Sequence, residues 1–237
     1  FLHRSDDAPL QIIPDGVSLD EALGVFGLTG MTAWFGVNEI GKPKSGDVFV
    51  VSSAAGATGS IAGQLARAMG CRVVGITSTD EKCQWLTDSI GFNAAINYTH
   101  EDWPQHLKKA CSGGIDVYFD NAGGDVLNVA LDQISDGARI VLCGGISRYN
   151  STTAQTGPEN YFNLIFRRAK MEGFIVLDYA SKFNSAISSM KPLIASGQLK
   201  HKATITDGFE ALPDALISIF EGTNIGKQIV CISPPSA

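Results

Sequence analysis

The sequence predicts an α/β protein built on a doubly wound parallel sheet of six strands, with helices on both faces. Three observations predict it. Short apolar runs of strand length alternate with stretches of helical periodicity. The apolar runs are continuous, as expected of strands that are buried on both faces. A glycine-rich turn follows the first of these runs and leads directly into a helix. Such alternation favours parallel strands joined by right-handed crossovers.

The elements follow in a regular order. Residues 1–20 are rich in turn-forming residues, and the small and apolar residues of 19–40 predict two closely packed helices. Strands are expected at 48–51, 72–76, 94–97, 115–119, 139–143 and 171–177. Helices are expected at 59–69, 80–90, 102–111, 126–134 and 159–168, and 150–158 is expected to be a polar loop. After the sixth strand the pattern predicts helices at 181–195 and 209–220 and a closing strand at 227–232.

Composition excludes several classes of function. The 237 residues include 18 basic and 24 acidic side chains, a net charge of −6, and 44% are hydrophobic. No cluster of Lys and Arg offers the basic face that a nucleic acid needs. No apolar run approaches the roughly 20 residues of a membrane-spanning helix. We therefore expect a globular protein that acts on neither nucleic acid nor membrane.

The cysteine pattern indicates a reducing compartment. Five cysteines are scattered through the chain and form no C-x-x-C pair, so they do not form a disulfide framework. The four histidines do not pair with them at the short spacings of a zinc site. The sequence thus predicts no metal site and a cytoplasmic location.

The glycine-rich turn after the first strand is the main candidate for ligand binding. It reads Ala54, Ala55, Gly56, Ala57, Thr58, Gly59. Gly56 lets the backbone approach a pyrophosphate, and Gly59 lets the following helix pack closely on the strand. The helix N-terminus then offers free N–H groups to phosphate. The alternative is a turn whose glycines serve packing alone.

The end of the second strand bears on the choice of dinucleotide. An NAD site places a carboxylate there for the ribose 2′-hydroxyl. This strand instead ends in Thr77 and Ser78, with Lys82 one helical turn later, which suits a 2′-phosphate. Asp80 and Glu81 are interpreted as favourable charges in the first turn of a helix. Tyr98, after the third strand, is expected at the adenine side or simply packed on the surface.

Two further loops leave the same edge of the sheet. One follows the fourth strand at Asp120 to Gly124, and the other follows the fifth strand at Cys143 to Asn150. Their glycines let a flat ring approach the backbone. Asp120 is interpreted as a helix-capping or loop acid.

At this point the sequence resembles a known family over about residues 27–232. The matching motifs are GLTGMTAWFG at 27–36, AAGATG at 54–59, GCRVVG at 70–75, DEK at 80–82, YFDN at 118–121 with GG after it, CGGISRYN at 143–150, MEGF at 171–174 and NIGK at 224–227. The sequence is similar to the cofactor-binding Rossmann fold of the medium-chain dehydrogenase/reductases. Within them it resembles the zinc-free group of leukotriene B4 12-hydroxydehydrogenase and prostaglandin reductase.

The resemblance implies NADPH or NADP+ as cofactor and a site for each part of it. Lys82 and Tyr98 would hold the 2′-phosphate end, and 54–59 would hold the pyrophosphate. The ribose and nicotinamide would be lined by Asn121, Cys143, Gly144, Ile146, Phe174, Ile175, Val176 and Asn224. Tyr149 would lie beside the cofactor and the substrate carbonyl as the catalytic residue.

The resemblance also implies a reaction, reduction of the C=C bond of α,β-unsaturated ketones and aldehydes. Hydride would pass to the β-carbon, and the Tyr149 hydroxyl would donate a hydrogen bond to the enolate oxygen. No metal is required. A quinone reductase of the same superfamily and a non-catalytic nucleotide-binding module are the alternatives. A homodimer is left open, because the sixth strand is an edge to which another strand can add.

This chain differs from the family in one respect. The family carries a GroES-like catalytic domain before the matching region. We therefore expect 1–26 to be a remnant of the junction with that domain, 27–222 to form the dinucleotide-binding domain, and 223–237 to return toward the junction. On this interpretation the chain alone binds NADPH but turns over poorly.

Overall fold

The computed structural model describes residues 13, 16–146 and 157–232. Six parallel strands form one sheet in the order β3-β2-β1-β4-β5-β6. Their bounds are Val48–Val51 (β1), Arg72–Thr77 (β2), Ala94–Asn97 (β3), Ile115–Asp120 (β4), Ile134–Leu142 (β5) and Lys170–Gly173 (β6). The chain runs outward from β1 to β3, then crosses back to β4 and runs outward again. This is the doubly wound Rossmann arrangement that the sequence predicted.

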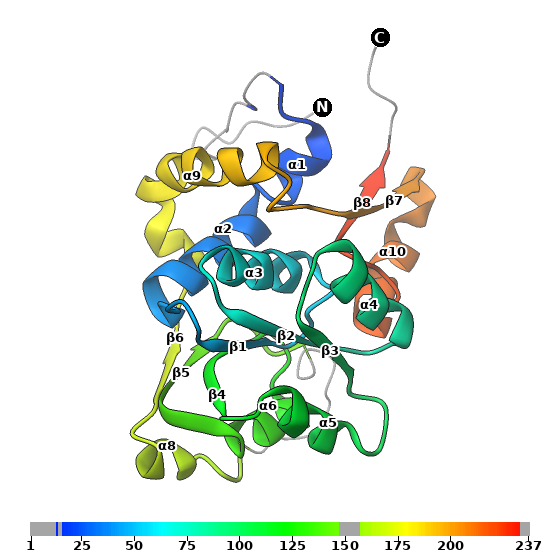
Figure 1. The fold of residues 1–237 in the computed structure, drawn as a ribbon. Helices are drawn as coiled ribbons and strands as arrows, with labels where there is room; N and C mark the ends of the chain where they lie inside the picture. Colours follow the sequence, from blue (N-terminus) through cyan, green and yellow to red (C-terminus); the bar gives the residue numbers. More distant parts are fainter. Residues whose placement is uncertain (1–12, 14–15, 147–156, 233–237) are drawn as a thin grey trace.

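Helices cover both faces of this sheet (Figure 1). On one face lie α1 (Leu19–Leu23), α2 (Leu28–Phe35), α3 (Ala57–Ala68) and α9 (Phe183–Ala195), and on the other α5 (Trp103–Ala110), α6 (Gly124–Leu131) and α8 (Asn163–Phe166). The helix α4 (Asp80–Gln84) follows β2, and α10 (Leu212–Glu221) lies beside the last strands. The remaining helical segments are two π-helices, η1 (Gly36–Gly41) and η2 (Trp85–Ser89), and two 3₁₀-helices, η3 (Val176–Lys182) and η4 (Phe209–Ala211).

The strands are buried on both faces because successive side chains serve different cores. Phe49 and Val51 of β1 belong to the core under α2, α3 and α9, whereas Val50 between them belongs to the core on the α5 and α6 side. β4 divides in the same way, with Phe119 on the first side and Tyr118 on the second. This explains why β1, at the centre of the sheet, is a continuous apolar run.

A second, two-stranded parallel sheet lies beside the main one. It pairs β7 (Ala203–Asp207) with β8 (Lys227–Cys231). The turn before β8 contacts the glycine-rich turn directly, because the Gly226 N–H donates to the carbonyl of Ala55 at 2.8 Å. Residues far apart in sequence thus meet at the carboxyl edge of β1.

Several boundaries differ from the sequence predictions. The predicted sixth strand 171–177 ends at Gly173, and the chain turns into η3 at Val176. The predicted helix 159–168 is helical only at Asn163–Phe166, and Arg168 then takes a left-handed φ of 51°. β5 begins at Ile134, where the sequence predicted the end of a helix. The prediction failed because Gly137, a typical turn residue, lies inside this irregular strand. β7 was not predicted, since its residues are half exposed and short of apolar side chains.

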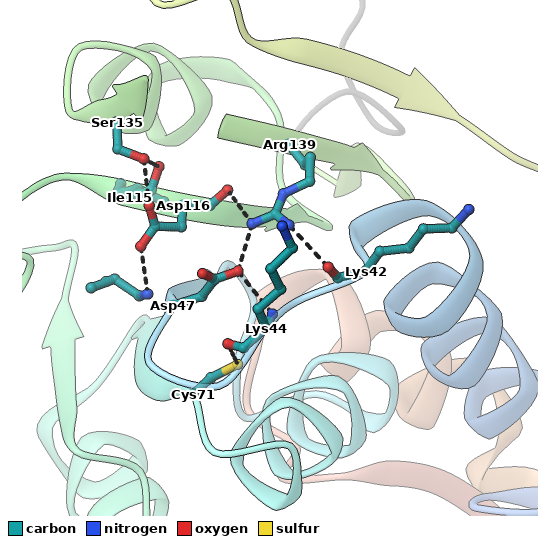
Figure 2. A network of polar contacts seen from close by, with 9 residues as sticks. Lys42, Lys44, Asp47, Cys71, Ile115, Asp116, Ser135 and Arg139 are labelled. Atoms are coloured by element: carbon teal, nitrogen blue, oxygen red, sulfur yellow. Dashed lines mark hydrogen bonds and ion pairs between the residues drawn. The ribbon is translucent and has the colours of Figure 1, made fainter. Parts of the chain in front are cut away.

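A polar network fastens the amino edge of the sheet, opposite the glycine-rich turn (Figure 2). The Arg139 guanidinium donates to Asp47 Oδ2 at 2.6 Å and to the carbonyl of Lys42 at 2.9 Å. Asp116 accepts from the Val48 N–H at 2.8 Å and from the Ser135 hydroxyl at 2.6 Å. The network ties the starts of β1, β4 and β5 together and leaves their carboxyl ends to line a cavity.

Candidate active site

A cavity of about 630 Å³ opens at the carboxyl edge of the main sheet. It lies where β1 and β4 are neighbours but their helices leave in opposite directions, the place where doubly wound sheets bind ligands. Eleven of the predicted cofactor residues line it: Gly56, Ala57, Thr58, Gly59, Thr77, Ser78, Lys82, Tyr98, Asn121, Ile146 and Asn224. Residues at or just after the carboxyl ends of β2, β1 and β4 therefore line one cavity, in the order in which these strands lie in the sheet.

The glycine-rich turn forms the middle of the cavity wall. Ser53 has a left-handed φ of 48°, which is unusual for a residue with a side chain, and its carbonyl accepts the Gly56 N–H at 3.0 Å. A methyl group on Gly59 would lie 2.5 Å from that carbonyl, so only glycine lets α3 begin here. No side chain caps α3, and its first turn holds no acid. The exposed N–H groups and the helix dipole favour an anion at this point.

Lys82 gives the β2 end of the cavity a buried positive charge. Only 7% of the residue is exposed, and burial lowers the pKa of its ammonium, although Glu81 opposes the shift. The ammonium donates to the carbonyl of Gly222, where α10 ends in a left-handed turn. Within the described ranges no carboxylate forms a salt bridge with it. A buried ammonium without a carboxylate can pair with an anionic ligand.

Asp80 does not compete for this end of the cavity. Its carboxylate accepts from the Asn97 side-chain amide at 2.8 Å and lies 3.4 Å from His100, and it is not part of the cavity wall. Thr79 caps the helix by accepting the Lys82 N–H at 3.2 Å. Asp80 and Glu81 stand in the first turn of α4, the place expected from sequence.

Asp120 lies behind the cavity and not in its wall. Its carboxylate accepts the N–H groups of Ala122 and Gly123, at 3.1 and 3.0 Å, at the start of α6. Burial raises the pKa of this carboxyl, and these hydrogen bonds oppose the shift. The geometry is that of the capping or loop acid that the sequence suggested.

Six predicted residues do not line the cavity, namely Ala54, Cys143, Gly144, Phe174, Ile175 and Val176. The Ala54 side chain is buried under the turn against Gly75. The N–H groups of Cys143 and Gly144 donate to the Asp120 carbonyl, and burial raises the pKa of the Cys143 thiol to about 12. Because β6 ends early, Ile175 is 63% exposed and Val176 begins η3. Tyr149, the predicted catalytic residue, lies outside the described residues.

The cavity also holds residues that sequence reasoning missed. They come from elements that reach it only through the fold: Thr29 of α2, Trp103 of α5, Asp125 and Val126 of α6, Phe220 and Glu221 of α10, and Lys227 and Gln228 of β8. The position of Trp103 at the start of the helix after β3 was a readable signal, because that loop leaves the ligand-binding edge. The α10 and β8 residues carried no such signal.

Comparison with known proteins identifies the family. The sequence profile described as zinc-binding dehydrogenase matches residues 57–192, more than half of the chain. The chain belongs to the zinc-binding dehydrogenase family. Over the described residues no group of three or more His, Cys, Asp or Glu side chains is placed to hold a metal ion. Nor is any helix there long and apolar enough to cross a membrane.

Individual relatives confirm the resemblance to the prostaglandin reductase group. The chain is 40% identical over 218 residues to 2-alkenal reductase (NADP(+)-dependent) of Nicotiana tabacum, covering 92% of this chain and 63% of that protein. It is 40% identical over 219 residues to prostaglandin reductase 1 of Bos taurus, covering 92% and 66%. The crystal structure of CurA in complex with NADPH from Vibrio vulnificus matches with a TM-score of 0.87 and 41% identity, over 91% of this chain and 66% of that one. The chain thus spans less than two thirds of the length of these relatives.

Proposed function

We propose that this chain binds NADPH and serves an oxidoreductase that reduces the C=C bond of α,β-unsaturated ketones or aldehydes. The observation that carries the proposal is the buried Lys82 ammonium at one end of a cavity whose centre is a glycine-rich turn. The cavity therefore offers two anion sites, one for a pyrophosphate and one for a further phosphate. The names of the relatives, an alkenal reductase and a prostaglandin reductase, support the class of substrate.

The residues present fit NADPH better than NADH. Thr77 and Ser78 line the cavity at the end of β2, where an NAD site would place a carboxylate. Lys82 Nζ has three donors, and one of them points to Gly222, so it can bind a phosphate without losing that contact. The first turn of α3, which no side chain caps, would hold the pyrophosphate.

The bound cofactor would supply a hydride, and the chain's own groups would hold the reacting parts in place. Asn121 and Ile146 line the cavity beyond the glycine-rich turn, on the side away from Lys82. We propose Tyr149 as the donor of a hydrogen bond to the substrate oxygen, where negative charge develops as the C=C bond is reduced.

Cofactor binding tests the proposal on the chain as it stands. Because a ligand that binds only the folded state stabilises it, NADPH at a hundredfold excess over its Kd should add about 2.7 kcal/mol and raise the Tm. NADH at the same concentration should raise the Tm much less. If neither dinucleotide raises the Tm, the glycine-rich turn serves packing alone and the proposal is wrong.

Turnover would separate the enone reaction from the quinone reaction. The measurement is NADPH consumption by the whole oxidoreductase that contains this chain, with an aliphatic enone and with a benzoquinone at equal concentrations. We expect faster consumption with the enone. A benzoquinone preference would replace the proposed substrate class but leave the cofactor site intact.

Two further features belong to the proposal. The five cysteines lie scattered along the chain and form no C-x-x-C pair, which supports a reducing compartment such as the cytoplasm. Within the described residues β6 is an edge of the main sheet, so strand addition by a second copy would give a homodimer. Sedimentation velocity would check the second point.

A further inference from the structure

A buried carboxylate organises the loop that follows β4. Asp120 is 1% exposed, and a single oxygen of its carboxylate, Oδ1, accepts four hydrogen bonds. The donors are the Ser52 hydroxyl at 3.0 Å, the Tyr118 hydroxyl at 3.0 Å, and the N–H groups of Ala122 at 3.1 Å and Gly123 at 3.0 Å. Two of the four come from the loop itself, so the carboxylate fixes the path of the loop.

Ser52 completes this arrangement from the end of β1. Its hydroxyl, which donates to Asp120, accepts the N–H groups of Asn121 at 2.8 Å and Ala122 at 3.2 Å. The Ser52 carbonyl accepts the Asn121 side-chain amide at 2.8 Å. Ser52 is fully buried, so these donors have no water to replace it. The loop is therefore held at three successive residues.

The same centre reaches the end of β5. The Asp120 carbonyl accepts the N–H groups of Cys143 at 2.9 Å and Gly144 at 3.1 Å, and the Asn121 carbonyl accepts the N–H of Ile146 at 3.1 Å. Asn121 and Ile146 both line the cavity, whereas Asp120 and Ser52 do not. The two buried residues thus support the wall without touching its contents.

The position of this wall gives the arrangement a function. In the sheet, β4 lies two places from β2, with the glycine-rich turn of β1 between them. If Lys82 takes the adenosine phosphate and the turn takes the pyrophosphate, the wall at β4 and β5 faces the nicotinamide half of the cofactor. Among the described residues Asp120 forms no salt bridge. Burying such a carboxylate costs free energy, and the fold gains a pre-formed wall from it.

We propose that Asp120 and Ser52 are positioning residues, which pre-form the nicotinamide half of the cavity by holding Asn121, Ala122 and Gly123 in place. This inference rests on the proposed function, since it assigns the two halves of the cavity to the two halves of NADPH. Without this support only a fraction of molecules would have the loop in its binding position. The apparent Kd for NADPH would rise in inverse proportion to that fraction.

A matched pair of serine variants tests the proposal. Ser52→Ala removes the hydroxyl that bonds Asp120 Oδ1 at the carboxyl end of β4. Ser135→Ala removes a hydroxyl that bonds Asp116 Oδ1 at 2.6 Å near the other end of the same strand, away from the cavity (Figure 2). Calorimetric titration of each folded variant with NADPH and with 2′,5′-ADP, which carries only the adenosine phosphates, compares the two halves of the site.

The expected result is a split between the two ligands. Ser52→Ala should weaken NADPH binding by about tenfold, the cost of leaving the part-buried Asn121 N–H without its partner, and change 2′,5′-ADP binding by less than about twofold. Ser135→Ala should change neither, even where it lowers the Tm as much. A residue that merely stabilises the fold would lower the Tm without this split. Asp120→Ala should show a larger difference between its losses of affinity for NADPH and for 2′,5′-ADP. If Asp120→Ala does not fold, Ser52→Ala alone provides the test.

The outcomes separate the inference from the proposed function. If the unmodified chain binds both ligands and Ser52→Ala binds both equally well, the positioning role is wrong and the NADPH site stands. If Ser52→Ala weakens both ligands alike, the network supports the whole site and the assignment to one half is wrong. If the unmodified chain binds neither ligand, the proposed function fails and the inference falls with it.

Discussion

Lys82 keeps an ammonium almost wholly out of water, with a backbone carbonyl as its partner. Replacing it by methionine keeps most of the side chain's length and removes the charge. The charge-assisted hydrogen bonds to a phosphate are each worth about 1.5–3 kcal/mol, so Lys82→Met should weaken NADPH binding by about 10- to 100-fold. NADH has no phosphate at that position, and its affinity should stay the same. Isothermal titration with both dinucleotides measures the ratio.

The stability of the same variant provides the control. Burial lowers the pKa of Lys82, which means that the folded state disfavours the charged form. Removing the charge should therefore leave the Tm without cofactor unchanged or slightly higher. An equal loss of affinity for NADPH and NADH, or a clear fall in Tm, would show that Lys82 is a structural residue instead.

How well single residues could be predicted depended on how local their signals are. Thr77, Ser78 and Lys82 follow a buried strand directly, so the strand's end fixes their place at the cavity. Ile175 and Val176 were assigned to the cofactor by the family resemblance alone. β6 ends at Gly173, and neither residue lines the cavity. Trp103 and Glu221 reach the cavity through contacts between elements, which no local pattern encodes.

At the scale of elements, central strands such as β1 and β2 were predictable because burial on both faces leaves a continuous apolar run. The edge strand β6, which reads Lys-Met-Glu-Gly, has no such run, and its predicted end was wrong. The helices were harder to bound. The expected helix 80–90 changes at Trp85 from α4 to the wider turns of η2, and the expected helix 181–195 starts as η3. These changes depend on what each helix packs against, so the sequence pattern predicts a helix but not its pitch. β7 and β8 form a two-stranded sheet of their own. The short, largely polar sequence of β7 does not by itself predict a strand.

The short helix α1 depends on polar contacts and should respond to acid. Ser18 and Glu21 form a capping box, and Asp20 accepts from the Ser18 hydroxyl at 2.5 Å and contacts His201 Nε2 at 2.9 Å. The Ser18 hydrogen bond, opposed in part by burial, lowers the pKa of Asp20 below 3.8. Because the folded pKa is the lower one, Asp20 stabilises the fold above its unfolded pKa, and this contribution is lost as the pH falls through the folded pKa.

Asp20→Asn should therefore flatten the acid limb of the stability curve. Near neutral pH it should cost about 0.5–1 kcal/mol, as expected for a partly exposed pair. The difference between the variant and the parent chain should begin to shrink below about pH 4, the unfolded pKa of an aspartate, and vanish below the lower folded pKa. Urea unfolding at a series of pH values measures both limbs. A constant difference at every pH would contradict the role given to the Asp20 charge.

The whole molecule is two sheets that meet at the cavity. The main sheet supplies the glycine-rich turn, the end of β2 and the loop after β4. The second sheet and α10 supply the opposite wall, with Asn224, Gly226 and Gln228 among its residues. The contact between the two sheets is backbone to backbone, from the Gly226 N–H to the Ala55 carbonyl. How closely the two walls of the cavity approach each other therefore depends on how closely Gly226 can approach Ala55.

Gly226→Ala should separate the two walls. Gly226 has a φ of 71°, and a methyl group there would lie 1.9 Å from the Lys202 carbonyl oxygen, so the backbone must move. Gly208→Ala is the matched control, since its φ is 97° but nothing lies within 4 Å of the added methyl group. The strain of a positive φ alone costs about 1–3 kcal/mol in each variant, and the clash in Gly226→Ala adds to it. Thermal unfolding with and without NADPH should show a lower Tm for both variants but a smaller NADPH-induced rise in Tm only for Gly226→Ala. Equal rises would mean that the second sheet contributes to the fold and not to the site.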